Sequence, residues 1–238
     1  MPTEISYKEQ MEKNGFVILP QVVKTETISQ VIVALENLTE SEHASEKEGE
    51  LFALRNLFEV LPIAKEIALG ADFLQIVERF LGENARLVRG LFFDKTPAAN
   101  WSLRWHQDKT IAVRERHKVP GYTPFTQKAG VLHVQPPAEI LDRMLTLRLF
   151  LDSADLTNGA LEVLQGSHCS GKKTDTQIER EIEVGTPFVC AGKRGDLLLM
   201  KPLLLHRSAS AQRAGHRRVL HFDYANTRLE GELEWLYP

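Results

Sequence analysis

From residue 86 onward the chain consists of short β-type runs separated by turn residues, and this pattern constrains the fold more than any other feature. Glycines at positions 159, 166, 192 and 195 lie between the runs or at their ends, where turns need positive φ. Many short strands without interleaved helices favour an antiparallel barrel or sandwich. The expected strands are Leu87–Phe93, Leu103–His106, Met144–Leu151, Leu161–Leu164, Pro187–Cys190, Asp196–Met200, Leu203–His206 and Val219–Tyr224.

Residues 1–85 are predicted to form a largely helical flank. Apolar residues recur at helical spacing behind Thr27 and again between Asp72 and Gly82. A short β-type run, Gly15–Pro20, is an exception, and the charged stretch Ser41–Glu50 is expected to be a solvated loop. Residues 86–225 would then form the barrel, and residues 1–238 a single domain.

The segment 110–142 does not follow the strand spacing, because it contains four prolines and two glycines. A loop of this length is uncommon in a compact domain. Two interpretations stay open, a surface insertion without a role and an active-site lid, and we expect the lid. Four residues in it are either anchors for an anionic substrate or exposed charges: Arg114, Arg116, His117 and Lys118.

Composition excludes several classes of partner. The formal net charge of −3 gives no electrostatic reason to expect nucleic acid or an anionic membrane surface as a partner. No window is apolar enough to predict a membrane span, and the first residues lack the apolar region of a signal peptide. The two cysteines lack the spacing of metal ligands. We therefore expect a cytoplasmic protein, and the sequence does not show its oligomeric state.

His106 and Asp108 are the first candidates for chemistry. Residues i and i+2 of a strand point to the same side, so this pair can offer two adjacent metal ligands. Oxygen-activating Fe(II) sites use two neutral imidazoles and one carboxylate and leave the other positions open. The third ligand should come from a distant strand.

His206 differs from the other histidines. It ends an apolar run that begins at Leu197, so its side chain is expected inside the sheet, where it must be hydrogen-bonded or bound to a metal. Either role fits the position taken alone. His43, His117 and His133 lie in the segments expected to be solvated.

Arg217 lies eleven residues after His206 and shares a strand face with Val219, His221 and Asp223. A buried guanidinium is costly unless it meets an anion, and its planar fork suits a carboxylate. With the hydroxyl of Ser208, it could hold the far carboxylate of a dicarboxylic cosubstrate.

The order His106-x-Asp108, His206, Arg217, with its surroundings, resembles the phytanoyl-CoA dioxygenase (PhyH) family of Fe(II)/2-oxoglutarate-dependent oxygenases. The resemblance extends from about residue 5 to residue 225. The segments that carry it are Asn14–Pro20, Phe93–Lys95, Trp105–Asp108, Leu149–Asp152, Asn158–Leu161, Gly166–His168 and Gly195–Leu198.

This resemblance implies a mainly β fold with flanking helices, a double-stranded β-helix (a jelly-roll, cupin-like barrel). It implies that His106, Asp108 and His206 bind iron. The implied reaction is hydroxylation of a small molecule with release of succinate and CO2, and the carboxylate ligand Asp108 favours hydroxylation over halogenation. The implied cofactors are Fe(II), the cosubstrate 2-oxoglutarate and O2, with ascorbate as an optional reductant.

The resemblance also implies a cosubstrate site. Arg217 would bind the C5 carboxylate of 2-oxoglutarate, with Ser208 as a second donor. Lys95 and Gln107 match positions that contact the cosubstrate in some members. For Lys95 an exposed lysine on a strand is the alternative, and strand parity turns Gln107 away from the metal face.

Two other classes of function stay open at this point. One is a metal-binding or ligand-binding barrel without turnover, and the other is a cupin-like metal isomerase. The substrate is not encoded in the motifs: an acyl-CoA, an amino acid, an osmolyte and a natural product are all compatible with them.

Overall fold

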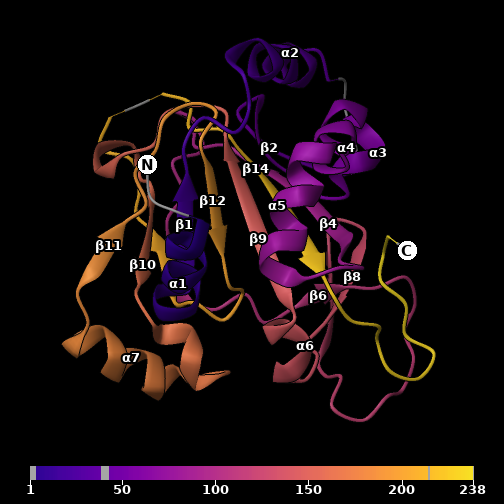
Figure 1. Cartoon of the computed structure of the whole chain (residues 1–238). Helices are drawn as coiled ribbons and strands as arrows, with labels where there is room; N and C mark the ends of the chain where they lie inside the picture. Colours follow the sequence, from indigo (N-terminus) through magenta and orange to yellow (C-terminus); the bar gives the residue numbers. More distant parts are fainter. Residues whose placement is uncertain (1–3, 39–42, 214, 238) are drawn as a thin grey trace.

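The main sheet of the protein has seven antiparallel strands (Figure 1). The computed structural model describes residues 4–38, 43–213 and 215–237. From one edge of the sheet to the other, the strands are β1 (Phe16–Leu19), β12 (Leu197–Met200), β9 (Met144–Phe150), β14 (Val219–Ala225), β4 (Arg86–Phe93), β3 (Glu50–Leu54) and β2 (Ala44–Lys47).

Helices cover one face of this sheet. In β9, Leu145, Leu147 and Leu149 point toward the helices, because alternate residues of a strand face opposite sides. Burying each such side chain stabilises the fold by about 1.5–3 kcal/mol. The helices are α1 (Glu4–Asn14), α2 (Thr25–Glu36), α3 (Leu57–Val60), α4 (Pro62–Ala68) and α5 (Ala71–Leu81).

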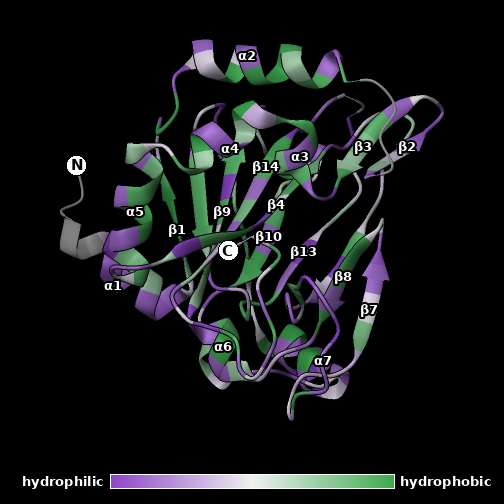
Figure 2. Cartoon of the chain, turned by 90° about the vertical axis from the view of Figure 1, so that its right-hand side faces the viewer, coloured by the Kyte–Doolittle hydropathy of each residue, from purple (hydrophilic) through white to green (hydrophobic). Residues whose placement is uncertain are grey.

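The opposite face of the seven-stranded sheet packs on a second, four-stranded sheet. Phe150 and Val219 from the first sheet share a core with Leu161 and Val163 from the second. Figure 2 shows the three layers in order: helices α1 and α5, then β9, β14 and β4, then β10 and β13. The strands of the second sheet are β11 (Pro187–Val189), β10 (Leu161–Leu164), β13 (His206–Ser208) and β5 (Leu103–His106).

The mainly β, jelly-roll fold with flanking helices is therefore confirmed, with local corrections. The strand predicted at Leu203–His206 is wrong: Pro202 and Leu203 form a turn, closed by Leu204 N–H donating to the carbonyl of Lys201 (3.0 Å), and the strand begins at His206. A helix that the strand pattern did not predict, α7 (Asp175–Val184), begins with a capping box made by Thr174 and Gln177. This motif is visible in the sequence and indicates the start of a helix.

The predicted solvated loop at Ser41–Glu50 is also wrong over most of its length. Residues 44–47 form β2, which pairs with β3, while residues 41 and 42 lie outside the described residues. Because β2 is an edge strand with half-exposed or exposed side chains, its polar composition resembles that of a loop.

The segment 110–142 is not a structureless loop. It contains a three-stranded sheet in the order β6 (Ile111–Ala112), β8 (Val131–Val134), β7 (Phe125–Lys128), followed by helix α6 (Ala138–Asp142). Ala129 and Gly130 join β7 to β8 with φ of 44° and 76°. Positive φ at both positions matches the right-handed twist of a hairpin, and the sequence Ala-Gly is a weaker hairpin signal than Asn-Gly.

Candidate metal and cosubstrate site

Strand pairing brings the two distant histidines together. In the register between β13 and β5, His206 lies opposite His106, and the centroids of their rings are 4.1 Å apart. Asp108 follows β5, where its N–H donates to the carbonyl of Pro202 at 2.9 Å. One ligand atom from each of the three residues lies within 4.8 Å of the others, so they form a cluster able to hold one metal ion.

Backbone carbonyls orient both imidazoles. Nδ1 of His106 lies 2.8 Å from the carbonyl oxygen of Arg104, and Nδ1 of His206 lies 2.8 Å from that of Leu204. A carbonyl oxygen can only accept, so each Nδ1 carries the proton and each Nε2 keeps its lone pair. These Nε2 atoms lie 3.9 and 3.7 Å from the carboxylate oxygens of Asp108.

The charges of the cluster suit Fe(II). Burial, together with His106, lowers the pKa of His206, which keeps this ring neutral. Burial alone would raise the pKa of Asp108, but the surrounding histidines and Arg89 hold it below its ordinary value. Two neutral nitrogens and one anionic oxygen are the donor set of open ferrous sites.

The cluster lines a cavity of about 440 Å³. Apolar side chains from the seven-stranded sheet, Leu91 and Phe93, form part of its wall, and Trp101 and Leu161 form another part. Arg148 also lines the cavity and is buried; its Nη1 lies 3.0 Å from Nδ1 of His221. The volume is ordinary for a site that binds small molecules.

Arg217 is buried directly before β14, with 1% of its surface exposed. Its Nε and Nη2 atoms have no hydrogen-bond partner among the described residues, although its backbone N–H donates to Asp94 at 2.9 Å. Its guanidinium carbon lies 6.0 Å from the ring of Trp101. Burial and the charge of Arg148 lower the pKa of Arg217 to about 9. A buried, unpaired cation fits an incoming carboxylate.

Lys95 is buried beside Arg217, so the alternative of an exposed lysine is wrong. Its Nζ donates to the carbonyls of Trp101, at 2.8 Å, and Ala209. Burial and the charge of Arg217 lower the pKa of Lys95 from 10.5 to about 7. These contacts place a second cationic group next to Arg217.

The lowered pKa of Lys95 predicts a pH-dependent stability. Between about pH 7 and pH 10 the unfolded chain binds more protons at this lysine than the folded chain does, so the free energy of unfolding should rise with pH. Lys95→Met should remove this rise, whereas the exposed Lys118→Met should keep it. Urea unfolding of the three proteins across that pH range measures the effect, and parallel curves for all three would contradict it.

Ser208 and Gln107 occupy different situations. Ser208 lines the cavity, and its hydroxyl donates to the carbonyl of Gly159 at 3.0 Å. The amide of Gln107 donates to the carbonyls of Leu203 (2.7 Å) and Gly171 (2.8 Å) and accepts from the N–H of Lys173 (2.8 Å). Gln107 also lines the cavity, but both N–H donors of its amide are used in these bonds, which tie together the segments beside His206 and Asp108.

Gly159 packs closely against Lys95 and Ser208. Its φ is 74°, and a Cβ here would lie 2.5 Å from the carbonyl oxygen of Ala209 and 2.9 Å from Nζ of Lys95. Gly159→Ala is therefore expected to destabilise the fold by about 1–3 kcal/mol and to raise KM for 2-oxoglutarate. Gly49→Ala is the control, because Gly49, in the turn between β2 and β3, also has positive φ (79°) but a Cβ there meets nothing within 4 Å. Equal effects of the two changes would show that only backbone strain matters.

Several residues of the cavity were not predicted. Arg55, Arg89, Lys128 and His133 line it, whereas the anchors considered from the sequence do not. Three of those anchors have other partners: Arg114 pairs with Glu234 (2.9 Å), Arg116 stacks on Phe125 (4.9 Å) and His117 pairs with Glu232 (3.3 Å). The fourth, Lys118, is exposed.

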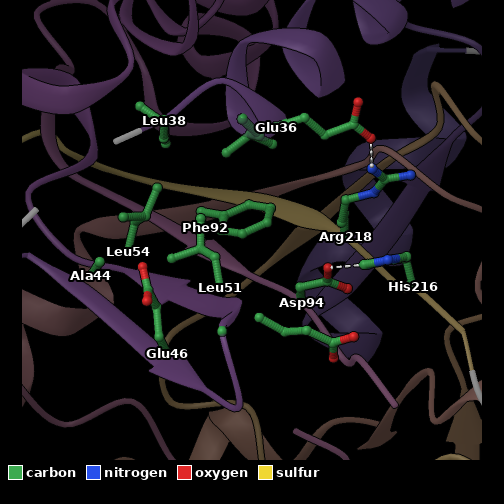
Figure 3. Close-up of a pocket in the computed structure, with 13 residues that line it drawn as sticks. Glu36, Leu38, Ala44, Glu46, Leu51, Leu54, Phe92, Asp94, His216 and Arg218 are labelled. Atoms are coloured by element: carbon green, nitrogen blue, oxygen red, sulfur yellow. Dashed lines mark hydrogen bonds and ion pairs between the residues drawn. The ribbon is translucent and has the colours of Figure 1, made fainter. Parts of the chain in front are cut away.

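A second cavity, of about 320 Å³, lies between α2, the β2–β3 hairpin and β4 (Figure 3). Two polar pairs line it: Arg218 pairs with Glu36 at 3.4 Å, and Nδ1 of His216 lies 2.6 Å from the carboxylate of Asp94 (Figure 3). Glu46 and Glu50 line it as well. Asp94 also accepts a hydrogen bond from the backbone N–H of Arg217, so this residue of the second cavity helps to position Arg217.

None of the described helices combines the length and the apolar content needed to cross a bilayer. No curated protein matches the chain. Solved structures of similar fold include AviO1 from Streptomyces viridochromogenes Tue57, with 18% identity over 97% of this chain and 98% of that chain and a TM-score of 0.71. EctD from S. alaskensis with 2-oxoglutarate and 5-hydroxyectoine has 15% identity over 94% of this chain and 77% of that chain (TM-score 0.73).

HygX from Streptomyces hygroscopicus, with nickel, 2-oxoglutarate and hygromycin B bound, has 19% identity over 93% of this chain and 87% of that chain (TM-score 0.66). At these identities the likeness concerns the fold. The sequence itself gives more, since the family model "Phytanoyl-CoA dioxygenase (PhyH)" matches residues 11–219. The chain therefore belongs to the phytanoyl-CoA dioxygenase family of Fe(II)/2-oxoglutarate-dependent oxygenases.

Proposed function

We propose that this oxygenase hydroxylates a small molecule, with His106, Asp108 and His206 as its iron ligands and Arg217 as the residue that binds the C5 carboxylate of 2-oxoglutarate. One observation carries the proposal: a His-Asp-His cluster lines a cavity near a buried arginine whose guanidinium lacks a partner among the described residues. In the balanced reaction, substrate C–H, O2 and 2-oxoglutarate give the alcohol, succinate and CO2.

The chain holds and orients the reactants. When bound, Fe(II) supplies the redox chemistry that couples decarboxylation of 2-oxoglutarate to oxidation of the substrate. The carbonyls of Arg104 and Leu204 fix both imidazole rings, so no proton has to leave Nε2 before metal binding. Arg217 neutralises the far carboxylate of the cosubstrate, and Ser208 donates to it once its hydroxyl turns away from the carbonyl of Gly159. Lys95 lies beside Arg217 and, with its pKa lowered to about 7, carries only part of a positive charge at neutral pH.

We further propose that the segment 110–142 acts as an active-site lid and that residues 1–238 work as one domain. Thr110, Lys128 and His133 from this segment line the cavity. A cytoplasmic location is part of the proposal, supported by Cys169 and Cys190, which are both free thiols.

The test is anaerobic addition of Fe(II) and 2-oxoglutarate to the metal-free protein. A metal-to-ligand charge-transfer band is expected for the wild type and not for His106→Ala. Absence of the band in the wild type would overturn the proposal. A screen of a metabolite library with O2, Fe(II) and ascorbate then looks for succinate release. A band without succinate for any compound would indicate a binding protein, and an isomeric product without succinate would indicate a metal isomerase.

A further inference from the structure

Two cationic side chains of the cavity, Arg55 and Lys128, have no ion pair or hydrogen bond among the described residues. The other cations that line it have polar partners: Arg89 pairs with Asp223 at 2.5 Å, and Nζ of Lys109 donates to the carbonyl of Lys173 at 2.5 Å. Arg148 contacts the ring of His221. Asp108 is the one carboxylate among the described lining residues, and it belongs to the metal cluster. The cavity therefore has unpaired positive charge besides that of the cosubstrate site.

Arg55 and Lys128 come from two hairpins that lie outside the four-stranded sheet. Arg55 follows β3, and Lys128 is the last residue of β7. His43 joins the two hairpins, since its Nδ1 lies 3.4 Å from the carbonyl oxygen of Ala129 and its Nε2 lies 3.4 Å from Nδ2 of Asn56. Figure 2 shows the β2–β3 and β7–β8 hairpins on the side of the molecule away from α1 and α5.

The two cations repel each other and Arg89. Burial, followed by the charge of Arg89, lowers the pKa of Arg55, and burial, followed by the charge of Arg55, lowers that of Lys128. Both groups also feel the carboxylate of Asp108. An anion between them would relieve this repulsion, and a molecule held there would extend toward the metal cluster.

His133 adds a second kind of recognition. It lines the same cavity with 1% of its surface exposed, and its Nε2 has no partner among the described residues. Its Nδ1 lies 3.0 Å from the carbonyl oxygen of Val131 and so carries the proton. Nε2 is therefore a buried acceptor, which suits a hydroxyl or amino group of a ligand.

We infer that Arg55 and Lys128 bind a carboxylate or phosphate group of the substrate, and that Nε2 of His133 accepts a hydrogen bond from a hydroxyl or amino group beside it. The substrate class is thus a small anionic molecule with a neighbouring donor, such as a hydroxy acid, an amino acid or a sugar phosphate. The inference rests on the proposed function, since it assigns the substrate end of the same cavity.

The experiment uses protein loaded with Mn(II) and 2-oxoglutarate, which occupy the metal and cosubstrate sites without turnover. Paramagnetic broadening of the phosphorus signal of inorganic phosphate, and of the carbon signals of acetate, reports binding of each anion near the metal. We expect saturable broadening by at least one of them, and the tighter binder identifies the head group. Arg55→Gln combined with Lys128→Gln should weaken that binding by about tenfold or more.

Arg116→Gln is the control, because Arg116 is on the same segment but stacks on Phe125 outside the cavity. Unchanged binding in the double variant, or no saturable broadening by either anion in the wild type, would overturn the inference. Binding of Mn(II) and 2-oxoglutarate is measured first, by electron paramagnetic resonance and calorimetry. Its failure would count against the proposed function instead. Glycolate should bind more tightly than acetate, and His133→Leu should remove this preference. If the variant still preferred glycolate as strongly as the wild type does, His133 would not belong to the subsite.

Discussion

Replacement of His206 by alanine or glutamine is expected to abolish iron-dependent release of succinate. The loss should exceed about 100-fold, because removal of a mere outer partner of a metal ligand already costs 10–100-fold. His206 is buried and its ring has a fixed orientation, so no exposed side chain can substitute for its Nε2. The measurements are succinate release with saturating 2-oxoglutarate and titration of Fe(II) binding.

The glutamine variant separates loss of the metal ligand from loss of packing around it. Alanine at this position leaves a void in the core between the sheets, whereas glutamine retains most of the volume. His117→Ala is the matched control, since His117 pairs with Glu232 away from the cavity. Wild-type turnover in His206→Gln would show that the metal binds elsewhere.

Replacement of Arg217 by methionine is expected to weaken binding of 2-oxoglutarate without lowering the stability of the protein. KM for 2-oxoglutarate should rise by about 100-fold or more, since two hydrogen bonds between charged groups are lost at about 1.5–3 kcal/mol each. The protein without cosubstrate should become no less stable, or more stable, because a buried charge without a partner is removed. Initial rates over a range of 2-oxoglutarate and thermal unfolding test the two effects separately.

The neighbouring Arg218 provides the control. Its guanidinium donates to both carboxylate oxygens of Asp152, at 2.8 and 3.1 Å. Arg218→Met should therefore lower stability by about 1 kcal/mol and leave KM for 2-oxoglutarate unchanged. If Arg217→Met lowered stability as Arg218→Met does, Arg217 would have a structural role.

The sequence predicted the chemistry of the site better than its surroundings. His106 and Asp108 are two residues apart, so strand geometry alone suggests that they act together. His206 could be joined to them only through the resemblance, because the pairing of β13 with β5 depends on contacts between residues about one hundred positions apart. Arg217 was recognisable because a buried arginine requires an anion.

The substrate side was harder to predict, for physical reasons. Arg55 and Lys128 lie beside polar edge strands, where exposed cations are ordinary. Only the tertiary arrangement shows that both line one cavity. Prolines on both sides of the hairpin β7–β8 suggested a loop rather than strands. The polar composition of β2 is likewise typical of a loop. The capping box of α7, in contrast, could be recognised in the sequence.

The position of these hairpins in the sheets bears on how the enzyme can change its substrate. β13 and β14 each have a hydrogen-bonded neighbour on both sides, which fixes the register of His206 and the chain next to Arg217. β2 and β7 each have a neighbour on one side. Substitutions and insertions in the two hairpins can therefore accumulate with little displacement of the metal ligands. Exchange of β7–β8 between relatives is thus a practical route to new specificities, and natural divergence could follow the same route.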